Sequence, residues 1–292
     1  MLLTVKASAT YEFSVETFLC LMVEPPLFGP KHRVLEERLL TSPTVFCDLR
    51  ADLYGNPRRH VIAPEGQFSF SFEATVEVEP NVALPSVSFE HPPQEIPGEA
   101  MVYTLPSRFC ESDLLARMAL DEFGHLPHGG ARILAIAEWV RRHVQYRYGT
   151  TDALTSAFDT ATERVGVCRD FAHLVIAFCR ALVIPARYVS GYALGLDPPD
   201  FHGFAQVYLG GAWHNVDATF EGVRPALIPI AVGRDASDVA MATTWVPHVL
   251  LAQSVEVREA AHRPADPAMP PPAQPEVSPA PVSNGWLATA ES

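Results

Sequence analysis

The chain has 292 residues, of which 48% are hydrophobic and 19% are charged, so it can bury one large core or two moderate ones. Its formal net charge of −13 would repel nucleic-acid phosphates and anionic lipid, and no cluster of Lys and Arg reverses this locally. Its apolar runs are shorter than the roughly 20 residues that cross a bilayer. We therefore expect no nucleic-acid partner and no membrane partner.

The five cysteines are scattered and form no CxxC pair, which argues against a disulfide framework and against a structural zinc site. The first residues lack the basic start and the uninterrupted apolar run of a signal peptide. Both features favour a reducing compartment, so we expect a cytoplasmic protein.

The N-terminal part of the chain has the pattern of β-strands. Apolar and polar residues alternate in segments such as residues 68–72 and 75–78, and turn clusters such as residues 54–57 separate the segments. A Pro-rich stretch over residues 91–98 follows. This pattern predicts a β-sandwich-like module over residues 1–95.

Helical spacing of apolar residues begins after the Pro-rich stretch. One amphipathic helix is expected after Ser112, and a second between Gly130 and Val144. A third apolar helical pattern starts at Cys168 and runs to Leu182, shortly before Pro185.

Three strands are expected next, over residues 186–194, 202–209 and 212–219, with a possible fourth over residues 246–257. The second and third form a hairpin around Gly210-Gly211. If this turn has two residues, Leu209 pairs with Ala212, and His202 lies diagonal to Asp217 on the same face. A loop one residue longer would separate the two side chains.

Cys168 follows a glycine turn and opens the third helical pattern. Backbone N–H groups and the helix dipole at such a position stabilise a thiolate. A nucleophilic cysteine also needs a base and a group that orients the base, and His202 and Asp217 supply these residue types. Taken singly, Cys168 could be a buried core residue, His202 a polar residue at a strand entrance, and Asp217 a turn residue.

Four features together resemble the core of the bacterial transglutaminase-like superfamily: residues 166–169 (GVCR), residues 184–192 (IPARYVSGY), His202, and residues 213–219 (WHNVDAT). The resemblance implies a papain-type triad of Cys168, His202 and Asp217. It also implies a transglutaminase-like (papain-like) α+β domain over residues 96–260, in which the nucleophile helix packs on an antiparallel sheet. The expected fold class is therefore α+β.

The chain departs from the family pattern at two places. Gly203-Phe204 follows His202 where Ala-Trp is usual, and Ala218 follows Asp217 where Pro is usual. Neither change removes a catalytic group. Both concern the walls of the cleft, so the resemblance does not extend to specificity.

The resemblance implies a cysteine hydrolase, a protease or amidase, that attacks a protein or peptide amide through a thioester. Backbone N–H groups at the helix start can stabilise the oxyanion, and this mechanism requires no cofactor and no metal. One alternative is a true transglutaminase, in which an amine resolves the thioester. Another is a non-catalytic module that binds peptides.

The remaining titratable and sulfur-containing residues near these motifs have structural interpretations. We expect Arg169 and Asp170 to support the helix start, His173 to be a hydrogen-bonded core residue, and Cys179 to be a small buried residue. His125 and His128 belong to an HxxH in a loop, which a solvated turn explains better than a metal site. Residues 261–292 are rich in proline and are expected to form a disordered tail.

Overall fold

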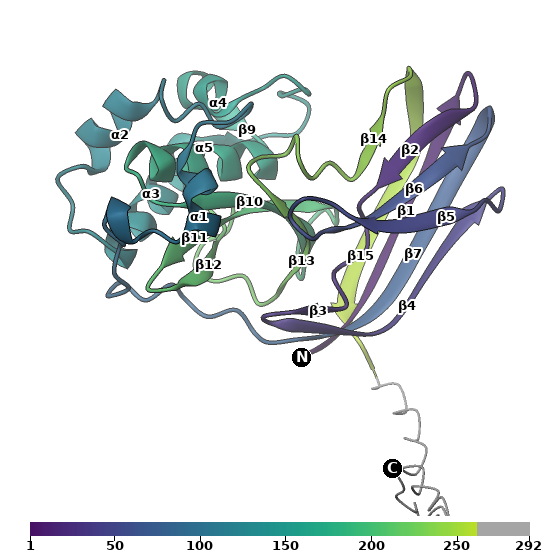
Figure 1. The fold of residues 1–292 in the computed structure, drawn as a ribbon, viewed down its shortest axis with the longest axis horizontal. Helices are drawn as coiled ribbons and strands as arrows, with labels where there is room; N and C mark the ends of the chain where they lie inside the picture. The colour runs from purple at the N-terminus through teal and green to yellow at the C-terminus, as the bar shows by residue number, and fades with distance from the viewer. Residues whose placement is uncertain (262–292) are drawn as a thin grey trace, which may run out of the picture. The chain divides into compact units, whose positions relative to one another are not determined.

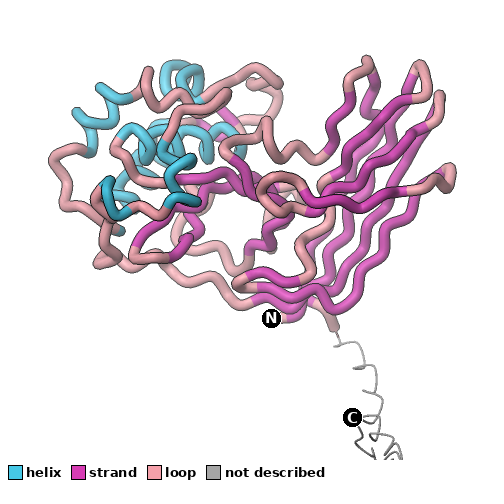
Figure 2. The backbone as a smooth tube through the Cα atoms, viewed as in Figure 1, coloured by secondary structure: helices cyan, strands magenta, loops and turns pink. Residues whose placement is uncertain are grey.

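A computed structural model of the protein describes residues 1–261, which belong to one compact unit. Strands account for more of this unit than helices do, and the helices gather around one of its sheets (Figures 1 and 2). The expected disordered tail, residues 261–292, lies outside the described residues except for its first residue.

Two antiparallel sheets form the expected sandwich-like module. The first has the order β15 (His248–Glu259), β1 (Leu2–Phe13), β7 (Gly66–Val78), β4 (His32–Ser42) and β3 (Phe28–Gly29). The second has the order β14 (Ala242–Thr244), β2 (Thr17–Leu21), β6 (Pro57–Ala63) and β5 (Cys47–Ala51). The turn expected at residues 54–57 lies between β5 and β6.

Alternation of side chains along the long strands produces the core of this module. In β1, every second residue from Leu3 to Phe13 is buried, while the residues between them stay partly exposed. β7 pairs with β1 along its whole length and buries Phe68, Phe70 and Phe72. A strand that buries one face in this way has a fixed register, because a slip of one residue would expose the whole apolar set.

The possible fourth strand expected over residues 246–257 is present and belongs to the sandwich. It forms β15, and β15 pairs with β1 over its whole length, from Leu3↔Glu259 to Phe13↔His248. The chain thus returns to the sandwich after residues 186–233, which form a separate sheet (Figure 1). The division at residue 95 stays a prediction, because residues 1–262 group as one unit.

The other four-stranded sheet is antiparallel, with the order β12 (Ala212–Val216), β11 (His202–Leu209), β10 (Ala186–Ala193) and β13 (Leu227–Gly233). β11 has the bounds expected from the sequence, and β13 is a strand that the sequence analysis missed. Helix α5 (Cys168–Ala181) contacts β10 and β11, and residues Asp170 to Arg180 of this helix are all buried.

Shorter elements surround α5. They are α1 (Gly98–Met101), α2 (Ala116–Phe123), α3 (Gly130–His143), α4 (Ala157–Glu163), the 3₁₀ turns η1 (Pro93–Glu95) and η2 (Val102–Thr104), and the parallel pair β8 (Gln145–Tyr146) and β9 (Val165–Gly166). The two amphipathic helices expected between Ser112 and Val144 are α2 and α3.

Local hydrogen bonds fix both ends of α5. At its start, the Asp170 carboxylate accepts a hydrogen bond from the Val167 backbone N–H at 2.9 Å, which satisfies one of the donors that a helix leaves open. At its end, Val183 adopts a left-handed conformation with φ 60°, and the Ile184 N–H bonds to the Cys179 carbonyl at 2.9 Å. The chain then turns at Pro185 into β10.

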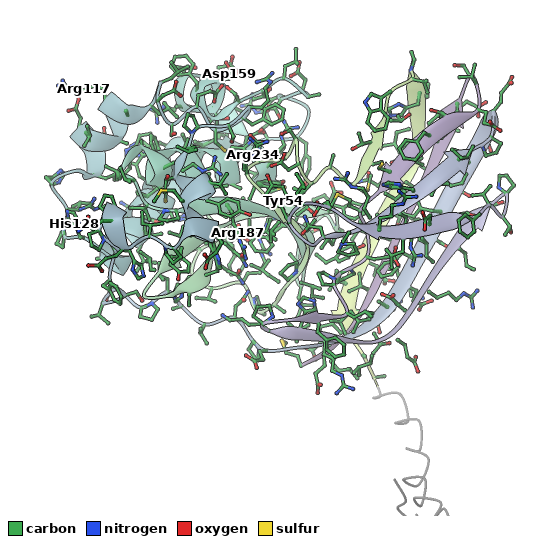
Figure 3. All side chains as sticks on the ribbon, viewed as in Figure 1. Tyr54, Arg117, His128, Asp159, Arg187 and Arg234 are labelled. Carbon is green, nitrogen blue, oxygen red and sulfur yellow. The ribbon has the colours of Figure 1, made fainter. Side chains whose placement is uncertain are left out.

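Three side chains connect the sandwich with β10, with β13 and with the loop after β13. Tyr54 donates to Asp238 at 2.9 Å and accepts from Arg234 at 3.1 Å, and Figure 3 shows Tyr54 and Arg234 next to each other. Asn56 bonds both backbone groups of Val232 at 2.8 Å. Tyr192 of β10 donates to the carbonyl of Val23 at 2.7 Å.

Asn56→Ala is expected to lower the free energy of unfolding by about 2–4 kcal/mol, because the buried Asn56 side chain is lost together with its two hydrogen bonds to the backbone of Val232. Urea denaturation measures this loss. Arg50→Ala, at an exposed position on β5, is the control and should change stability by less than about 0.5 kcal/mol. A similarly small change for Asn56→Ala would show that the contact between Asn56 and Val232 does not hold the sheet of β6 and the sheet of β13 together.

Candidate active site

The hairpin of β11 and β12 brings His202 and Asp217 together. The register is the expected one: Leu209 pairs with Ala212 across the two-residue turn Gly210-Gly211, where both glycines have positive φ of 58° and 84°. β11 begins at His202, and Asp217 follows the end of β12. The His202 Nε2 and Asp217 Oδ2 atoms lie 2.8 Å apart. The diagonal contact expected from the sequence is therefore present.

Two further residues hold the Asp217 carboxylate. Oδ2 also accepts from Arg224 Nε at 2.8 Å, and Oδ1 accepts from the Thr219 N–H at 3.1 Å and from the Thr219 hydroxyl at 2.6 Å. Burial alone would raise the pKa of Asp217, but the hydrogen bonds from His202, Thr219 and Arg224 hold it well below its usual range. Asp217 is therefore a buried, ionised acceptor.

The sequence analysis did not identify Thr219 or Arg224. Thr219 had a usable signal, because a threonine two residues after an aspartate is well placed to bond its carboxylate. Arg224 had none, because the contact depends on how the loop after β12 folds back.

His202 is almost completely buried, with 2% of its surface exposed. Burial disfavours the charged ring, but the hydrogen bond with Asp217, the interaction with Cys168 and the charges of both groups outweigh it and raise the pKa of His202 to about 9. Because Asp217 occupies Nε2, the other ring nitrogen, Nδ1, is the one available to Cys168. Nδ1 has no regular hydrogen-bond partner among residues 1–261. The contact between Nδ1 and the Cys168 sulfur is therefore longer than a standard hydrogen bond.

Cys168 is the first residue of α5 and is partly exposed. The β8–β9 pair places Tyr146 opposite Gly166, and the Arg147 N–H bonds to the Gly166 carbonyl at 3.0 Å. Burial raises the pKa of Tyr146, the charge of Cys168 adds to this, and a hydrogen bond from the Cys168 backbone N–H opposes it.

The neighbouring residues have the structural roles expected for them. Asp170 is fully buried and accepts from Val167 and Arg169. His173 is fully buried, its Nε2 accepts from the Ala236 N–H at 3.1 Å, and burial lowers its pKa to about 3. Cys179 is fully buried.

The HxxH pair lies in the loop between α2 and α3, as expected. His128, labelled in Figure 3, is largely exposed, and its Nδ1 lies 3.5 Å from Glu90. Within residues 1–261, no three His, Cys, Asp or Glu side chains are grouped so that they could hold a metal ion. In the same range, no helix combines the length and apolar character needed to span a bilayer.

A cavity of about 360 Å³ lies beside the Asp217 carboxylate. Its walls include Asp217, Arg224 and Phe220, together with residues from α3 and from the segment after β7, but neither Cys168 nor His202. The cavity therefore touches Asp217 and contains neither of the other two residues of the expected triad.

Comparisons with known proteins identify a family and several relatives. Residues 120–218 match the model of the transglutaminase-like superfamily. An uncharacterized protein of Mycobacterium leprae is 38% identical over 120 residues, which are 37% of this chain and 42% of the relative. A Mycobacterium tuberculosis relative, also uncharacterized, is 36% identical over 110 residues, 32% of this chain and 35% of the relative.

The matched segments thus span less than half of these two relatives. A crystal structure of a proposed cysteine protease from Cytophaga hutchinsonii is similar over much more of the chain. It is 37% identical, covers 90% of this chain and 92% of its own, and superposes with a TM-score of 0.84. On this similarity and the family match, the chain belongs to the transglutaminase-like superfamily.

Proposed function

We propose that the protein is a cysteine hydrolase that cleaves a peptide or side-chain amide through a Cys168 thioester. One observation carries the proposal: the buried 2.8 Å bond between His202 and Asp217 lies next to a cysteine that opens a buried helix. The name of the Cytophaga hutchinsonii neighbour as a proposed cysteine protease supports the same class of reaction.

The reaction begins from a thiolate and an imidazolium. His202, with its pKa raised to about 9, is protonated at neutral pH, and Asp217 stabilises its charge. The sulfur attacks the amide carbonyl, an S–C bond forms, and the carbonyl oxygen becomes an oxyanion. We expect backbone N–H groups at the start of α5, including that of Cys168, to donate hydrogen bonds to this oxygen.

Collapse of the tetrahedral intermediate breaks the C–N bond, and the amine leaves with the proton from His202. The neutral ring then takes a proton from a water molecule that attacks the thioester. The acid product leaves, and the thiolate and imidazolium form again. The five cysteines are all free, which fits our proposal that the reaction takes place in the cytoplasm.

Cys168→Ala is expected to abolish amide turnover and to leave the melting temperature within a few degrees of the wild type. Casein serves as a general amide substrate. Mass spectrometry detects new peptide termini, and a second assay measures released ammonia. A fluorescent primary amine is added as an acceptor for the acyl group. New termini or ammonia indicate hydrolysis, and uptake of the amine indicates a transglutaminase.

Cys179→Ala, at a buried position on the same helix, is the matched control and should keep the activity. Turnover that persists in Cys168→Ala would end the proposal. If the wild type is inactive and its Cys168 is alkylated by iodoacetamide no faster than the other cysteines, the peptide-binding alternative takes its place.

Substitutions at Asp217 and at Thr219, which bonds its carboxylate, should lower kcat to different degrees. Asp217→Asn removes the charge that holds His202, so kcat is expected to fall on the order of 10²–10⁴-fold. Thr219→Val keeps the side-chain volume and removes only the 2.6 Å hydroxyl bond to Asp217, so kcat should fall about 3–10-fold. Steady-state kinetics and thermal melts of both variants check this order.

Thr162→Val on the surface of α4 is the control for loss of a threonine hydroxyl, and it should have wild-type kinetics. Full activity of Asp217→Asn would remove Asp217 from the catalytic triad.

A further inference from the structure

The loop after β12 carries Arg224, and its last residues are held by hydrogen bonds from outside the loop. The carbonyl of Arg224 accepts from the side-chain amide of Asn81 at 3.0 Å, and the carbonyl of Pro225 accepts from the backbone N–H of Asn81 at 3.1 Å. The carbonyl of Ala226 accepts from the Leu194 N–H at 3.1 Å. Asn81 therefore supplies two of these three bonds.

Asn81 belongs to none of the strands beside it. It lies three residues after Val78, the last residue of β7, in the segment that leads from the sandwich towards α1 (Figure 1). A single partly buried side chain, close to the end of a sandwich strand, thus contacts the loop that carries Arg224.

A ladder of polar side chains on three strands ends at Asn81. Arg187 of β10 donates to the side-chain oxygen of Gln206 on β11 at 2.8 Å, and Gln206 donates to the side-chain oxygen of Asn215 on β12 at 2.9 Å. Asn215 then donates to Oδ1 of Asn81 at 3.0 Å. Arg187, Gln206 and Asn215 are directly opposite one another in the strand register, so the ladder crosses the sheet in a straight line.

Arg187, labelled in Figure 3, sets the direction of this ladder. A guanidinium can only donate, so each amide turns its oxygen towards Arg187 and its NH₂ group away from it. The Arg187 guanidinium carbon lies 4.0 Å from the centre of the Trp213 ring, which holds it in place. Gln206 is 9% exposed, and hydrogen bonds out of water polarise and strengthen one another. The NH₂ group of Asn81 is thereby directed at the Arg224 carbonyl.

The ladder lies on the face of the sheet that carries His202. Gln206 follows His202 by four residues on β11, so alternation places both side chains on one face. Asn215 is opposite Gln206 and two residues before Asp217. Beyond the ladder, Arg224 Nε and His202 Nε2 both lie 2.8 Å from Asp217 Oδ2. A permanent cation and the expected base thus share one carboxylate oxygen.

We infer that Asn81 is a positioning residue that holds Arg224 against the carboxylate that His202 also bonds. With Arg224 in place, the guanidinium balances part of the negative charge of Asp217, so the imidazolium is stabilised less than it would be by the carboxylate alone. His202 then gives its proton more readily to the leaving amine. This last step rests on the proposed function. The segment after the sandwich would in this way take part in the reaction.

An NMR titration of the His202 ring tests the inference without a substrate. Arg224→Gln removes the cation, so the midpoint of the titration should move up by about one pH unit, the low end of the effect of a charge roughly 4–6 Å away. Asn81→Ala loosens the guanidinium without removing it and should move the midpoint up by about half as much. The double variant should titrate like Arg224→Gln alone, because Asn81 acts through Arg224.

Asn56→Ala is the matched control, because Asn56 also bonds two backbone groups through its side-chain amide, in its case both from Val232. This variant should melt at a lower temperature and keep the wild-type titration of His202. Asn81→Ala, at a partly buried position in a loop, should melt within a few degrees of the wild type. A shift caused by lost stability alone would therefore be larger in Asn56→Ala.

The inference is overturned if either Arg224→Gln or Asn81→Ala leaves the His202 midpoint unchanged or lowers it, or if the two shifts add in the double variant. Alkylation of the wild type by iodoacetamide at pH 6 tests the proposed function separately. If Cys168 reacts no faster than the other cysteines, the proposed function fails, and the role of Asn81 in proton transfer fails with it, whatever the titrations give.

Discussion

The site depends on one buried carboxylate. Asp217 accepts four hydrogen bonds, one from His202, one from Arg224 and two from Thr219. An isolated charge in this position would be very costly, and these donors offset that cost. The same carboxylate keeps His202 protonated despite its burial. A protonated base beside a cysteine is what a thiolate nucleophile needs, so the chemistry follows from how Asp217 is held.

The fold supplies this arrangement through a small number of local constraints. The Gly210-Gly211 turn sets the β11–β12 register and with it the distance from His202 to Asp217. Asp170 fixes the start of α5 and therefore the place of the cysteine. The sandwich supports the sheet from outside through Asn56 and through Tyr192 of β10. Precision at the site thus depends on contacts far from it in sequence.

Features that depend on neighbouring residues in the chain could be predicted from the sequence. Helical spacing predicted α5, and a two-residue glycine turn predicted the meeting of His202 and Asp217. Contacts made across the fold were not predictable: the alternation in β15 predicts a strand, but its partner is the open edge of β1, more than 230 residues earlier. Arg224 and Tyr146 reach the site through loop folding and a short parallel pair, for which the sequence carries no spacing signal.

The direct test of this account is an NMR titration of the His202 ring in the wild type and in Asp217→Asn. The account predicts that wild-type His202 titrates with a pKa of about 9, and that the pKa falls in the variant, because burial then acts without the opposing carboxylate. A wild-type pKa at or below the usual value of about 6.5 would contradict it, since His202 would then be neutral beside Cys168 at physiological pH.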